Sequence, residues 1–274
     1  MKIDNINNIK NIKNIKNNLI VEIEKLVKII KYEYPNLVNI PMEYDLYKIV
    51  HIEETGTISL FVRKGEFYFP LDAFKVLETF KKIPGFGINK NHKTYTKNNM
   101  ILNDNTFMTY IQHVFLKGLT AEEYFKEILL HETLHFCGSG GESALREGIN
   151  ELKTRQLAQK YNLLTSACGY PKETKIAYEL EELFGEDIIN KIAFSKNRSE
   201  LIEILTSVSK EAMEFFLELD KIMEKEFDDK YYRYKFPGIM GPFKKAKRYN
   251  SIDYSQAYVL IEKYKDYSKS HKIK

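Results

Sequence analysis

The chain has few of the residues that build disulfide-linked or membrane-spanning proteins. It has no tryptophan. It also has only two cysteines, Cys137 and Cys168, which are too few for the disulfide framework of a small secreted domain. We expect both cysteines to be free thiols. The longest early apolar run, residues 19–21, is far too short for a signal-peptide core or a membrane span. These absences lead us to expect a soluble, cytoplasmic protein.

Arginine is also scarce, with six in 274 residues. Basic charge nevertheless gathers near the C-terminus, where residues 230–274 hold twelve Lys or Arg and three Asp or Glu. Such a segment could contact an anionic partner such as nucleic acid or a membrane surface. Because arginine is the residue best suited to phosphates and base edges, we expect a solvated tail instead. A basic nucleic-acid-associated protein remains an alternative.

The rest of the composition, 43% hydrophobic and 29% charged, is typical of a globular protein. Residues 1–18 repeat Asn-Ile-Lys, and we expect them to be frayed or loosely helical. Residues 19–274 are expected to form a single domain. Its predicted parts are an N-terminal α/β part at about 19–118, active-site helices at about 120–161 and a C-terminal helical part at about 170–274.

Periodicity and turn residues place the secondary structure within these parts. Residues 57–70 read as two strands joined by a turn at Lys64-Gly65, and a further strand is expected from Met100. The Gly-, Asn- and Lys-rich residues 82–100 read as a loop. Helices are expected at 19–32, 72–82, 107–116, 120–137, 143–161, 173–184, 185–194, 198–229 and 253–269.

The stretch HETLH, residues 131–135, carries the strongest chemical signal. His131 and His135 lie four residues apart, so on a helix they share a face about one turn apart, and one turn rises about 5.4 Å. Their rings can then converge on one zinc ion, and Glu132 between them can act as general base towards a bound water. The alternative is a core helix whose histidines bond to backbone carbonyls.

A catalytic zinc site needs a third protein ligand. Gly138, Gly140 and Gly141 follow the motif and permit a chain reversal, after which Glu147 and Glu151 lie one turn apart on the next helix. We expect Glu147 to bind the metal and Glu151 to orient a histidine ligand, although Glu151 could itself be the ligand. The alternative for the pair is a solvated acidic stripe.

HETLH, a glycine break and "LREGINE" together resemble the gluzincin group of zinc metallopeptidases. The resemblance covers about residues 120–160; a weaker one, to uncharacterised zincin-like proteins of low-GC Gram-positive bacteria, extends further. The gluzincin resemblance implies an α+β, mainly helical, zincin-like body that holds one zinc ion. In that body His131, His135 and Glu147 would be the ligands and Glu132 the base. Two departures are Arg146, where the group often has Asn, and the short gap of eleven residues between His135 and Glu147.

A peptidase must also stabilise the oxyanion that forms when water attacks the carbonyl, and Tyr170 in a Gly-Tyr-Pro loop is our candidate. The predicted function is hydrolysis of peptide bonds in a peptide or protein substrate. A zinc-binding module that recognises a protein partner without turnover remains an alternative. The sequence indicates neither the substrate nor the oligomeric state.

Overall fold

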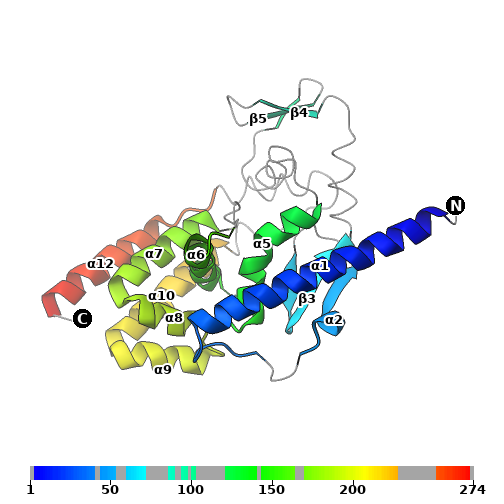
Figure 1. The fold of residues 1–274 in the computed structure, drawn as a ribbon. Coiled ribbons are helices and arrows are strands. Elements are labelled where there is room, and N and C mark those ends of the chain that lie inside the picture. The colour runs from blue at the N-terminus through cyan, green and yellow to red at the C-terminus, as the bar shows by residue number, and fades with distance from the viewer. Residues whose placement is uncertain are drawn as a thin grey trace. The chain divides into compact units, whose positions relative to one another are not determined.

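The computed structural model describes residues 3–40, 44–53, 60–71, 86–89, 94–97, 100–102, 121–140, 143–163, 170–227 and 251–271. The chain forms two compact units (Figure 1). The first unit comprises Met1–Pro35, Ile40–Cys137 and Leu164–Ala167, and the second comprises Asn36–Asn39, Gly138–Leu163 and Cys168–Lys274.

The first unit begins with a long helix, α1 (Ile3–Glu33), which packs on α5 (Ala121–Phe136). Its buried face includes Leu19, Ile23 and Ile30, all fully covered. The helix already starts at Ile3, so the Asn-Ile-Lys repeats adopt the helical one of the two states that we expected for them. It ends just before Pro35, as its sequence indicates.

A small sheet lies against α5 in the same unit. After the short helix α2 (Leu46–Ile49), β1 (Val50–Glu53) pairs in parallel with β3 (Glu66–Pro70), which pairs antiparallel with β2 (Phe61–Arg63). The predicted turn is confirmed: Lys64 and Gly65 have φ angles of 53° and 75°, as a two-residue hairpin requires. Phe67 and Phe69 are fully buried, and their rings contact Phe136 and Phe125 of α5.

A second antiparallel sheet contains β4 (Phe86–Asn89), β5 (Thr94–Lys97) and β6 (Met100–Leu102). The strand expected from Met100 is confirmed. The expectation that residues 82–100 form a loop is wrong for β4 and β5, which pair with each other through their backbones. The helices predicted at 72–82 and 107–116 lie outside the described residues.

The regular elements described in the second unit are all helices. Its helices are α6 (Ala144–Lys160), α7 (Pro171–Phe184), α8 (Glu186–Ala193), α9 (Arg198–Val208), α10 (Lys210–Phe227) and α12 (Ser255–His271). The single helix expected over 198–229 is two helices, because Ser209 has extended backbone and its hydroxyl accepts from the Ala212 N–H at 2.9 Å. Core side chains include Phe216 and Leu219 of α10 and Ile261 of α12.

The described elements are therefore mainly helical with small sheets, which is compatible with the predicted α+β class. Among these residues, no helix combines the length and the apolar character needed to cross a membrane.

Candidate metal centre

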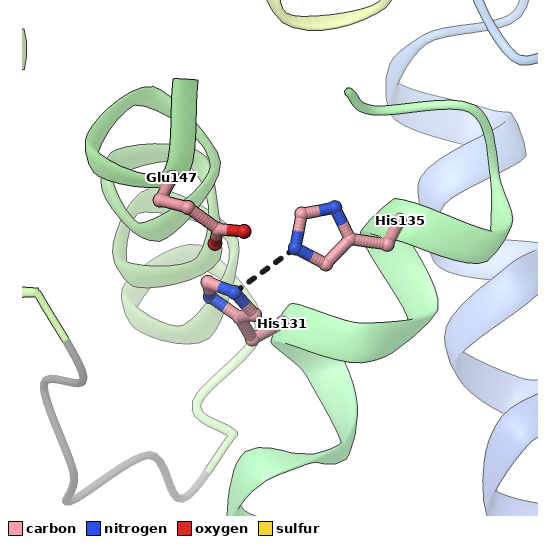
Figure 2. A group of neighbouring side chains, drawn as sticks. All are labelled: His131, His135 and Glu147. Carbon is pink, nitrogen blue, oxygen red and sulfur yellow. Dashed lines mark hydrogen bonds between the residues drawn. The ribbon is translucent and has the colours of Figure 1, made fainter. Parts of the chain in front are cut away.

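Helix α5 presents the two histidines of HETLH on one face. Leu129, Leu130 and Leu134 are buried around them, so apolar packing fixes the helix that carries the two imidazoles. The Nε2 atoms of His131 and His135 lie 3.1 Å apart, with their ring planes at 76° to each other. Figure 2 shows both rings turned towards each other from successive turns of the helix.

Glu147 of α6 completes a group that could hold a metal ion (Figure 2). One ligand atom from each of His131, His135 and Glu147 lies within 4.8 Å of the others. Of the two glutamates that the sequence left open, Glu147 belongs to this group and Glu151 does not. Cys137 is also outside it, and burial raises the pKa of its thiol to about 12, which disfavours the thiolate that binds metals.

The donor set fits zinc in both chemistry and spacing. Zinc binds imidazole nitrogen at about 2.0–2.1 Å in tetrahedral geometry, so two ligating nitrogens stand about 3.3 Å apart. The Nε2 atoms of His131 and His135 are already near that separation. Two histidines and one glutamate are also a donor set found in zinc sites that keep a fourth position open.

The first turn of α6, which carries Glu147, is fixed by its own unit. The Ser143 hydroxyl accepts from the Arg146 N–H at 3.3 Å, and the Glu224 carboxylate accepts from the Ala144 N–H at 2.9 Å. Both oxygens accept from N–H groups in the first turn of the helix, which have no hydrogen-bond acceptor within the helix itself. Shortly after α5 ends, Gly138 has a φ of 103°, a conformation that disfavours other residues, which explains a glycine at this position.

Arg146 ties the same turn to the end of α8. Its guanidinium Nη2 donates to the carbonyl oxygens of Ile192, Ala193 and Ser195 at 3.3, 3.4 and 2.9 Å. Those carbonyls belong to the negative end of a helix, where a cation is favoured. Arg146 therefore has a role within the second unit that the shorter, uncharged side chain of an asparagine could not fill.

The turn after Glu147 is held by close backbone packing. A Cβ on Gly148 would lie 2.5 Å from the carbonyl carbon of Glu173 at the start of α7. Glu173 is itself fully buried, and its carboxylate accepts from the Tyr254 hydroxyl at 2.6 Å. Gly148 thus lets α7 approach the helix that carries Glu147.

Glu132, the predicted base, has a partner that the sequence did not reveal. Its Oε2 accepts a hydrogen bond at 2.9 Å from the backbone N–H of Val62 on β2. Seventy residues separate the two positions, and a backbone donor leaves no trace in residue identity. Only the register of β2 against β3 could have suggested it.

The structure also places the other two predicted residues. Glu151 is 3% exposed, and its Oε1 accepts from the Arg155 Nε at 3.4 Å. Tyr170 immediately precedes α7, with its ring 6.2 Å from that of Phe227. The roles of Glu151 in orienting a histidine and of Tyr170 in binding the oxyanion stay predictions.

Comparison with known proteins adds no relative. A scan of protein-family models, a search of curated proteins and a search of solved structures each found no match to this chain. The interpretation of the site therefore depends on the residues that compose it.

Proposed function

We propose that this protein is a zinc-dependent hydrolase of the gluzincin kind that cleaves peptide bonds. The observation that supports this most is the group formed by His131, His135 and Glu147, whose ligand atoms lie within 4.8 Å of one another. The two histidines belong to an HExxH motif, in which Glu132 supplies the carboxylate. The three side chains would hold one zinc ion. When bound, the ion supplies a Lewis acid that lowers the pKa of water towards ~7 and polarises a carbonyl.

Glu132 performs the proton transfers in this proposal. Its carboxylate takes a proton from the attacking water and then delivers that proton to the leaving amine, so that one side chain acts first as base and then as acid. The position of Glu132 between the two histidines places it one residue's rotation from the ligand face of α5. This geometry favours a role beside the metal over a role as a ligand.

Tyr170 is proposed to stabilise the oxyanion by donating its hydroxyl hydrogen, and Glu151 to orient a histidine ligand. The buried position of Glu151, one turn beyond Glu147 on α6, supports the second assignment. The substrate class that we propose is a peptide or protein.

The replacement Glu132→Gln tests the function. We expect the purified variant to bind zinc as tightly as the parent protein and to lose hydrolysis of a broad peptide library by about 10²-fold or more, because a positioned base contributes about 10²–10⁴-fold. The matched control is Glu186→Gln, an exposed carboxylate on α8, which should hydrolyse at the parental rate.

Three outcomes would contradict the proposal. A parent protein that retains zinc without turning over any peptide would indicate a non-catalytic recognition module. Parental activity in Glu132→Gln would show that Glu132 is not the general base. Salt-sensitive nucleic-acid binding that is lost with residues 230–274, in a protein without zinc, would favour the nucleic-acid alternative.

A further inference from the structure

Strand β2 is an edge of its sheet in the part of the chain that the structure describes, where the strand order is β1-β3-β2. Opposite residues in an antiparallel pair alternate between hydrogen-bonded and non-hydrogen-bonded positions. Arg63 and Glu66 flank the two-residue turn, and Val62 faces Phe67 one position further from it. The N–H of Val62 therefore points away from β3, out of the sheet edge.

That outward N–H is the donor to Glu132. The distance from the Val62 nitrogen to the Glu132 Oε2 is 2.9 Å, within the range for a hydrogen bond to an ionised carboxylate. Both ends of the bond are well anchored. Phe67 opposite Val62 is fully buried against Phe136 of α5, and Leu134 within the motif is also fully buried.

We propose that the Val62 N–H is the positioning group for the general base. A glutamate side chain turns about three bonds, and each proton transfer requires its oxygen at one place. A donor on the backbone of a paired strand cannot rotate away as a side-chain donor can. The bond therefore holds one oxygen of Glu132 and with it the orientation of the whole carboxylate.

This inference depends on the proposed function for its catalytic meaning, but the bond can be tested without zinc or substrate. In the metal-free protein, hydrogen exchange of the Val62 amide should be slowed roughly ten- to a hundredfold, as a charge-assisted hydrogen bond implies. Glu132→Ala should abolish this protection, whereas His135→Ala, which leaves the carboxylate in place, should retain it. The amides of Phe61 and Arg63, which face β3, should stay protected in both variants.

The second arm measures catalysis. Val62→Pro removes the N–H without removing a ladder bond to β3, and Val62→Ala keeps the N–H as the matched control. We expect Val62→Pro to lower kcat about tenfold or more with KM and zinc affinity unchanged, because only the orientation of the base is lost. Val62→Ala should retain the parental kcat.

The outcomes separate the two proposals. A protein that takes up no zinc refutes the proposed function. A Val62 amide that exchanges in the parent protein as fast as in Glu132→Ala refutes the bond, and a parental kcat in folded Val62→Pro refutes its role. If Val62→Pro does not fold, the exchange measurement alone decides.

Discussion

Replacing Gly148 by alanine tests how the helix that carries Glu147 is packed. The new Cβ would meet the carbonyl carbon, carbonyl oxygen and Cβ of Glu173 at 2.5, 2.6 and 2.7 Å. Ordinary contact begins at 3.4 Å, so the first turn of α7 must move away by nearly an ångström. Because most of the obstruction is backbone, no side-chain rotation can relieve it. Overpacking of this kind costs about 1–3 kcal/mol.

Helix propensity acts in the opposite direction. Alanine is favoured over glycine within a helix by about 1 kcal/mol. The expected net loss in the free energy of unfolding is therefore about 0–2 kcal/mol, towards the upper value because the clash involves main-chain atoms. The matched control is Gln159→Ala on an exposed position of the same helix, which should change stability by less than about 0.5 kcal/mol.

Urea denaturation followed by circular dichroism measures both variants. A midpoint shift without a change in slope reports stability alone. If Gly148→Ala is more stable than the parent by about 1 kcal/mol, propensity alone has acted and the close approach of α7 to Gly148 is refuted.

Further predictions concern groups around the candidate site. Arg146→Met should destabilise the protein by about 2 kcal/mol by removing a charged donor from the α8 carbonyls, and calorimetry that finds parental stability would contradict this role. Glu181→Ala should cost about 3–5 kcal/mol, because it leaves the fully buried Lys153 ammonium without its carboxylate; an unchanged urea midpoint would contradict it. In a Cys168→Ser background, Cys137 should resist alkylation at pH 8, because burial raises its pKa to about 12. Rapid labelling of the folded protein at pH 8 would contradict the burial. Because the folded protein keeps the thiol protonated, the raised pKa contributes to the stability of the fold below pH 9, and this contribution is lost as the pH rises towards 12.

Local patterns predicted the elements that carry the site. The four-residue spacing of His131 and His135 and the glycine at 138 describe short-range geometry, and the structure reproduces both in α5 and the turn that follows it. Ser143 as the first cap of α6 is another local signal that the structure contains. These features depend on neighbours a few residues away, so the sequence alone is informative about them.

Contacts between distant residues could not be predicted in the same way. The bond from Val62 to Glu132 requires the register of an edge strand, and the carbonyls that receive Arg146 belong to a helix about 46 residues further on. β1 was not predicted because four residues show too little alternation, although pairing with the buried β3 stabilises it. β5 departs from the predicted loop, and its Thr, Tyr and Lys residues stand in a segment whose many turn formers favour that prediction.

The central claim is that His131, His135 and Glu147 bind one zinc ion, and metal stoichiometry tests it most directly. Elemental analysis of the purified protein, before and after dialysis against zinc, should give one zinc per chain. The same measurement should give none for Glu147→Ala and one for Glu151→Gln, because only Glu147 lies with the histidines. A parent protein that takes up no stoichiometric zinc, or Glu147→Ala that keeps it, would contradict the account.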